Sequence, residues 1–112
     1  MAHYEQSLSG DVEPFIAHLD QVVLGRSVTA KQEDAADHRI GDARMVVRVY
    51  ERYSAMGGNR VSLSVAVLCV GAEMSVTAIT SGGSQAMFFK INTLGEEAFL
   101  QKAVEAIQGY AA

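Results

Sequence analysis

The sequence contains a single cysteine, Cys69, so no disulfide can form within the chain and no cysteine-rich metal site is available. Cys69 lies in an apolar stretch, where we expect a buried thiol, and a lone thiol fits a reducing compartment. No apolar run approaches the roughly 20 residues that span a bilayer, and the N-terminus lacks a basic segment followed by an apolar one. We therefore expect a soluble, cytoplasmic protein with no membrane partner.

Basic residues are also scarce. Nine Lys and Arg stand against thirteen Asp and Glu, and the resulting net charge of −4 is unfavourable for binding a phosphate backbone. The three histidines, His3, His18 and His38, are scattered along the chain without metal-ligand spacing. We therefore expect no nucleic-acid partner, no metal and no cofactor.

The remaining composition is that of an ordinary globular protein. Hydrophobic residues make up 49% and charged residues 20% of 112 residues, which indicates one domain over residues 1–112. After a short strand at 3–8, apolar residues recur every three or four positions from Val12 to Val23, which predicts a helix at 12–24. Asp11 is a suitable N-cap and Gly25 suits the position after the last turn.

The middle of the chain shows two-residue alternation. Residues 27–31 can form a strand, whereas 32–42 are polar and acidic without an apolar period, which predicts a loop. Strands follow at 43–55 and 60–70, and a three-residue Met56–Gly58 loop would set Val49 opposite Val65, so that their apolar faces match. A two-residue turn at Gly71-Ala72 then sets Val67 opposite Val76 and Val65 opposite Ala78.

The end of the chain combines a strand and a helix. Alternation predicts a last strand at 85–91, and the capping-box spacing of Thr93 to Glu96 predicts a helix at 94–109 with Phe99, Val104 and Ile107 in its apolar stripe. The fold class is therefore α+β, in the order β-α-β-β-β-β-α, with an antiparallel sheet and two helices packed on one face. In outline this resembles helix-and-curved-sheet folds that hold ligands between sheet and helix, but a fold does not imply a function.

The predicted register leaves a second sheet face with an unusual mixture of arginine, aromatic and aliphatic side chains. Its predicted members are Arg44, Arg48, Tyr50, Arg52, Ser62, Ser64, Ala66, Leu68, Thr77, Ile79 and Phe88. Arginine and aromatic residues are enriched at protein interfaces, so Arg48, Tyr50, Arg52, Ile79 and Phe88 are candidate interface residues of a homodimer. A solvated face and a small-ligand surface are the alternatives.

The same register places Glu51 on the helix-covered face, where a carboxylate must be paired, hydrogen-bonded or protonated. It is either a residue at the core margin bonded to Tyr53, Thr80 or a basic group, or a general acid or base. In the second case Arg60 or a glycine-rich anion loop would hold a small anionic substrate. That candidate loop consists of Ser81, Gly82, Gly83 and Ser84, although it lacks the phosphate-loop signature.

Four blocks carry a family resemblance: RVYERYS at 48–54, GGNRVS at 57–62, AITSGGSQAMFFKINT at 78–93 and GEEAFL at 95–100. They resemble those of a bacterial family of about 110-residue proteins classified as a domain of unknown function. The resemblance implies a single-domain bacterial protein and supplies no catalytic residue. We therefore expect a non-catalytic small-molecule-binding or protein-interaction module, with a small enzyme using Glu51 on an anionic substrate as the alternative.

Overall fold

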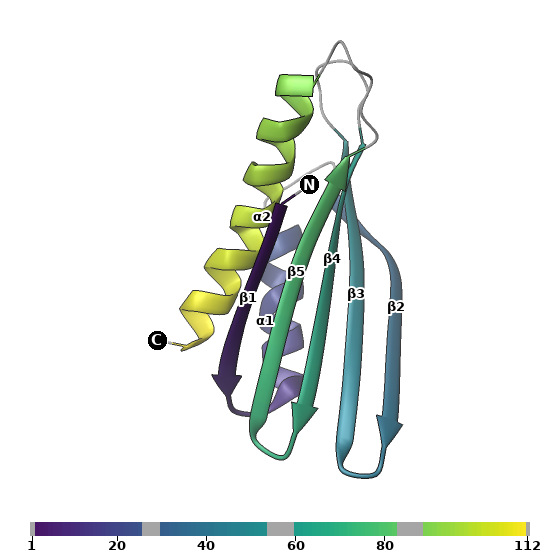
Figure 1. The fold of residues 1–112 in the computed structure, drawn as a ribbon, viewed down its shortest axis with the longest axis vertical. Helices are drawn as coiled ribbons and strands as arrows, with labels where there is room; N and C mark the ends of the chain where they lie inside the picture. Colours follow the sequence, from purple (N-terminus) through teal and green to yellow (C-terminus); the bar gives the residue numbers. More distant parts are fainter. Residues whose placement is uncertain (1, 26–29, 54–59, 83–88, 112) are drawn as a thin grey trace.

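The described residues form a five-stranded antiparallel sheet with two helices on one face (Figure 1). The computed structural model describes residues 2–25, 30–53, 60–82 and 89–111, and for 89–96 it describes the backbone. The elements are β1 (Ala2–Ser9), α1 (Val12–Leu24), β2 (Ala30–Ile40), β3 (Ala43–Tyr53), β4 (Arg60–Val70), β5 (Glu73–Gly82) and α2 (Phe89–Ala111). The sheet order is β1-β5-β4-β3-β2. The predicted fold class and element order are confirmed.

The core lies between the sheet and the two helices. Helix α1 has the predicted bounds and buries Phe15, Ile16, Leu19 and Val23. Helix α2 packs against α1, β1, β4 and β5, with Phe99 fully buried. Its other buried residues are Ala103, Ala106 and Ile107, whereas Val104 is only half-buried. Among the described residues, no helix combines the length and apolar character needed to cross a membrane.

Helix α2 begins earlier than predicted. The backbone is helical from Phe89, so the strand predicted at 85–91 is wrong for residues 89–91, and residues 85–88 lie outside the described part of the chain. The predicted helix at 94–109 falls within α2, and the spacing of Thr93 to Glu96 lies inside the helix and does not mark its start.

The β4–β5 hairpin has the predicted register. Val67 pairs with Val76 and Val65 with Ala78, across a two-residue turn at Gly71 and Ala72. Gly71 has φ of 60°, and Ala72 has no positive φ, as in a turn whose first central residue alone is left-handed. This register aligns the buried residues of both strands on the helix-covered face.

Residues 32–42, predicted as a loop, mostly form strand β2, so this prediction is wrong. β2 pairs with β3 through a second two-residue turn, in which Gly41 has φ of 57°. Nearly every residue of β2 is exposed, and a β-bulge interrupts the pairing between Gln32 and Asp34. A strand that buries neither face has no reason to alternate, which is why the sequence pattern does not reveal it.

The β3–β4 register differs from the predicted one by a single residue. Val65 pairs with Arg48, and Val49 pairs with Ser64, so the prediction of Val49 opposite Val65 is wrong. The predicted loop at 56–58 lies outside the described residues, which resume at Arg60, the partner of Tyr53. Because side chains alternate between faces, this shift moves every side chain of β3 to the opposite face.

Candidate functional site

The candidate site is the sheet face that turns away from both helices, here called the open face. Three central strands contribute only uncharged side chains to its middle, because the charged residues of β3 between Ala43 and Val49 point toward the helices. These central residues are Ala43, Met45, Val47 and Val49 of β3, Ser62, Ser64, Ala66, Leu68 and Val70 of β4, and Ser75, Thr77, Ile79 and Ser81 of β5.

All of the large apolar side chains that are exposed among the described residues lie on this face. They are Ile40 at 84% exposure, Leu68 and Val70 at 50%, Tyr53 at 40%, Met45 at 39% and Ile79 at 38%. Met45 and Leu68 are direct cross-strand partners on β3 and β4. The four of these at the turn end of the sheet, Ile40, Met45, Leu68 and Val70, are neighbours in the register, and an exposed apolar patch of this kind is typical of an interaction site.

Charged residues surround this uncharged middle. On the edge strands they are His3 and Glu5 of β1 and Lys31, Asp34 and His38 of β2, and at the strand ends they are Glu51, Arg60 and Glu73. The rim therefore carries both signs of charge around an uncharged centre. Protein interfaces have this anatomy.

Glu51 belongs to this rim and not to the helix-covered core, so its predicted placement is wrong. Its carboxylate forms an ion pair with Arg60 and accepts a hydrogen bond of 3.3 Å from the hydroxyl of Ser62. Arg60 and Lys31 also lie 5.4 and 5.9 Å from the centre of the Tyr53 ring. Of the alternatives predicted for Glu51, a bond to a basic group is correct, and the group is Arg60.

Arg48, Tyr50 and Arg52, predicted as interface residues on the open face, lie instead on the helix-covered face. Tyr50 is fully buried and donates a hydrogen bond of 2.5 Å to Asp20 of α1. Burial, reinforced by this hydrogen bond, raises the pKa of the Tyr50 hydroxyl. Nε of Arg48 is 3.4 Å from the same Asp20 carboxylate. These side chains position α1 over β3 and are not part of the open face.

Arg52 has the same orientation. Its guanidinium stacks over the ring of Phe99 on α2, 4.8 Å from the ring centre, and burial lowers the pKa of Arg52. Of the five predicted interface residues, Ile79 lies on the open face, and Phe88 lies outside the described residues.

Arg44 joins three elements at the turn end of the sheet. Its guanidinium lies 2.6 Å from carboxylate oxygens of both Asp37 on β2 and Glu13 on α1. The hydrogen bond from Arg44 lowers the pKa of Asp37. Because both acids already hold Arg44, this arginine serves the structure and does not present a free cation.

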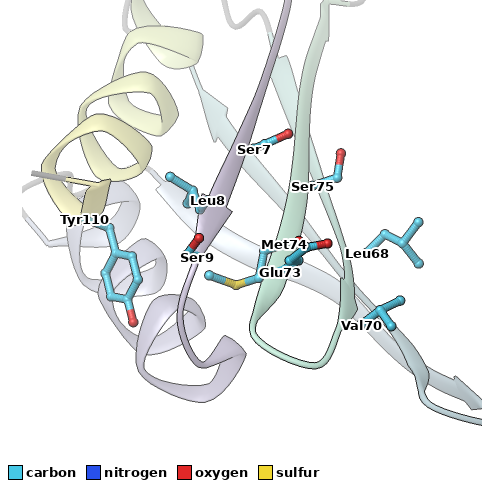
Figure 2. A pocket seen from close by; sticks show the side chains of 9 residues that line it. All are labelled: Ser7, Leu8, Ser9, Leu68, Val70, Glu73, Met74, Ser75 and Tyr110. Carbon is cyan, nitrogen blue, oxygen red and sulfur yellow. The ribbon is translucent and has the colours of Figure 1, made fainter.

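Two hollows lie near this end of the sheet. The larger, about 660 Å³, extends from Leu68 and Val70 of β4 past the start of β5 to Leu8 of β1 and Tyr110 of α2 (Figure 2). It thus continues the apolar end of the open face toward α2. The smaller, about 320 Å³, lies beside the start of α1 and is lined by Arg44 and its partner Glu13, together with Asp11, Arg39 and Asp42.

The other predicted site features do not come together. Ser81 and Gly82 close β5, whereas Gly83 and Ser84 of the predicted anion loop lie outside the described residues. His18 lies next to Tyr110 on α2, far along the chain from His3 and His38 on the two edge strands. Within the described residues, no group of three or more His, Cys, Asp or Glu side chains could hold a metal ion.

Of the exposed apolar residues of the open face, Ile40, Met45, Tyr53 and Val70 were not predicted from the sequence. A signal for Ile40 was present: Gly41-Asp42 has the same glycine-first form as the Gly71-Ala72 turn, and two-residue turns of this kind join paired strands. That turn pairs Ile40 with Ala43 on the face that carries Met45.

The comparison with known families agrees with the resemblance inferred from the sequence blocks. No curated protein matches the chain. A family model described as a family of unknown function (DUF6054) matches residues 1–111. The match covers nearly the whole chain, and the chain therefore belongs to the DUF6054 family of unknown function.

Proposed function

We propose that this protein is a non-catalytic interaction module that forms a homodimer through the open face of its sheet. The observation that carries the proposal is the position of the exposed large apolar side chains, which all lie on the one sheet face that no described helix covers. Removing such a patch from water is favourable in proportion to its apolar area. The uncharged centre and charged rim match an interface better than a solvated sheet face, which would carry Lys, Glu and Thr throughout.

The open face as a whole is comparable in size with a protein interface. Eight residues at about 3.4 Å each and five strands at about 4.8 Å each give a face of roughly 27 by 24 Å, or about 650 Å² in projection. Side chains make the accessible area larger than the projection. The face therefore approaches the roughly 800 Å² per partner of a standard protein interface.

The occupant that fits this face best is a second copy of the same chain. A rim of one sign would repel an identical rim, but Lys31 and Arg60 on this rim are balanced by acids such as Asp34 and Glu73. The small Ser and Ala side chains of β4 allow two sheets to approach to the usual spacing of about 10 Å. An apolar patch is, moreover, its own apolar complement across a two-fold axis.

The geometry favours this function over an enzyme that uses Glu51. The Glu51 carboxylate is already bound by Arg60 and Ser62, and it lines neither of the two hollows. A general acid or base needs a substrate within hydrogen-bond reach.

The test is the solution mass of the protein over a range of concentrations, by light scattering. We expect the wild type to approach 24 kDa, twice the 12.0 kDa of one chain. The double variant Met45→Glu and Leu68→Glu should have the mass of one chain, because each side chain contributes to the apolar centre and neither belongs to the buried core. A wild type that stays monomeric at tens of micromolar would overturn the proposal.

The matched control adds the same two charges elsewhere. Ala98→Glu and Gln101→Glu lie at exposed positions of α2, on the helix side of the sheet, and should leave the dimer intact. Circular dichroism and urea unfolding establish that both double variants fold. If the Met45 and Leu68 variant does not fold, Met45→Ser with Leu68→Ser removes the apolar surface without adding charge, and the same loss of dimer is expected.

A further inference from the structure

The open face is not uniform along its strands. At the end formed by the two-residue turns it carries the exposed apolar residues Ile40, Met45, Leu68 and Val70, with the rim residues His38 and Glu73 beside Met45 and Val70. The opposite end carries the charged cluster of Lys31, Glu51 and Arg60 around Tyr53. The two ends therefore favour different surroundings, the first an apolar partner and the second water.

We infer, resting on the proposed homodimer, that the two copies pack with their strands antiparallel and that the two-fold axis crosses the sheet beside the Met45–Leu68 pair. This pair lies at the centre of the apolar end, flanked along β3 and β4 by Val47, Ala66 and Val70. Binding energy concentrates in desolvated residues at the centre of an interface. A residue on a two-fold axis meets its own copy, so Leu68 contacts Leu68 of the second chain.

The direction of the axis follows from the charges. A two-fold axis running along the strands would superpose the charged ends of both copies and bring Arg60 toward its own copy, with Lys31 on the flank. Like charges brought together at an interface are costly. An axis running across the strands at Met45 and Leu68 makes the two charged ends project in opposite directions, where both stay solvated.

The antiparallel arrangement also matches large side chains with small ones. A half-turn about an axis through Met45 and Leu68 places Val70 of one copy opposite Ala66 of the second copy. In the same way it brings Ile40 of β2 over Ala36, and Val47 of β3 over Ala43. Facing sheets pack well when their inner side chains interdigitate in this manner.

The test is chemical cross-linking of single introduced cysteines. A short bismaleimide reagent is suitable, because stacked sheets lie about 10 Å apart and a direct disulfide requires Cα atoms within about 7 Å. Leu68→Cys, on the axis, should be converted largely to a covalent dimer on a denaturing gel. Ser64→Cys, also exposed on β4 but away from the axis, should remain largely monomeric.

Two control proteins accompany these variants. Wild type, whose only thiol Cys69 is buried, and Gln101→Cys on the helix side should both give little covalent dimer. Equal cross-linking of Leu68→Cys and Ser64→Cys would mean an axis along the strands and would overturn the inference. Failure of both to cross-link while light scattering still finds a dimer would also overturn it. Neither outcome affects the proposed homodimer, which fails only if the wild type is monomeric.

Discussion

Tyr50 of β3 and Asp20 of α1 are joined by a hydrogen bond of 2.5 Å, which the phenolic hydroxyl donates to the carboxylate beneath the helix. The Tyr50 ring is fully buried, while Asp20 stays partly exposed at the margin of α1. Such a side chain combines a large apolar body with one polar tip that needs a partner. The pair therefore fixes both the position of α1 and the face to which Tyr50 points.

Replacing Tyr50 by Phe tests this pair. The substitution keeps the buried ring and removes only the hydrogen bond to a charged group, so we expect the free energy of unfolding to fall by about 1.5 kcal/mol. Urea denaturation measures this change in the free energy of unfolding. The control is Tyr53→Phe, at an exposed position of the same strand, which should change stability by less than about 0.5 kcal/mol. Equal effects of the two substitutions would contradict the role of the Tyr50–Asp20 pair.

Phe99→Ala tests the packing of α2 on the sheet. Phe99 is fully buried, and its ring also contacts the Arg52 guanidinium. Its truncation should therefore lower the free energy of unfolding by about 3–5 kcal/mol. Gln101→Ala, exposed on the same helix, is the control and should be nearly neutral. A loss below about 1 kcal/mol for Phe99→Ala would mean that α2 is peripheral to the core. Val104→Asp should lower the free energy of unfolding by less than a charged residue in place of Phe99 would, because Val104 is only half-buried.

The Asp37–Arg44 pair predicts a pH dependence of stability. The pKa of Asp37 is lowered in the folded protein from 3.8, chiefly by the hydrogen bond from Arg44. An acid with a lowered folded pKa contributes stability above its unfolded pKa and loses it as the pH falls through the folded value. The difference in urea midpoint between wild type and Asp37→Asn should therefore be constant near neutral pH and shrink below about pH 4. In an Arg44→Met background the pH dependence should be smaller, because only the charges of Arg39 and Arg48 then still lower the pKa of Asp37.

Two glycines with different backbone conformations should respond oppositely to alanine. Gly71 has φ of 60°, where an added Cβ is strained, so Gly71→Ala should destabilise the protein by about 1 kcal/mol or more. Gly109 lies in α2, and a Cβ there would make an ordinary contact of 3.8 Å with Nε2 of His18. Since alanine is the better helix former, Gly109→Ala should be neutral or stabilising by up to about 1 kcal/mol. Thermal unfolding of both variants checks the opposite signs.

The sequence predicted the elements whose patterns are dictated by burial on one face. Helix α1 and the β4–β5 hairpin were predicted correctly because their apolar periods are unambiguous and Gly71 allows a two-residue turn. Strand β3 was assigned to the wrong face because it is apolar on both sides: Val46 and Tyr50 are buried beneath α1, while Met45 and Val47 lie on the open face. When both alternating sets are apolar, periodicity cannot choose between them.

Because β3 was assigned to the wrong face, the predicted candidate site contained the wrong β3 residues. Arginines on the covered face were unexpected, since a charged group is costly to bury unless it is paired. Each has a partner that comes from a distant part of the chain: Arg44 pairs with Glu13, Arg48 lies near Asp20, and Arg52 stacks on Phe99. Such partners are visible only once the helices are placed. A second sheet face was predicted, and so were several of its β4 and β5 members, including Leu68 and Ile79, but Val70, Ser75 and Ser81 were not.

Strand β2 bears on whether the proposed dimer could grow further. It is the outermost strand of the sheet, its residues are exposed on both sides, and it combines several acids with a bulge beside Asp34. A strand added alongside it would have to accommodate the irregular backbone and approach these carboxylates, which are common protections against edge-to-edge pairing. If growth is blocked at β2 and the open face is occupied by a single partner, neither of these two surfaces can add a third chain. The irregular, acidic backbone that hid β2 from the sequence pattern would then also oppose fibre growth through this edge.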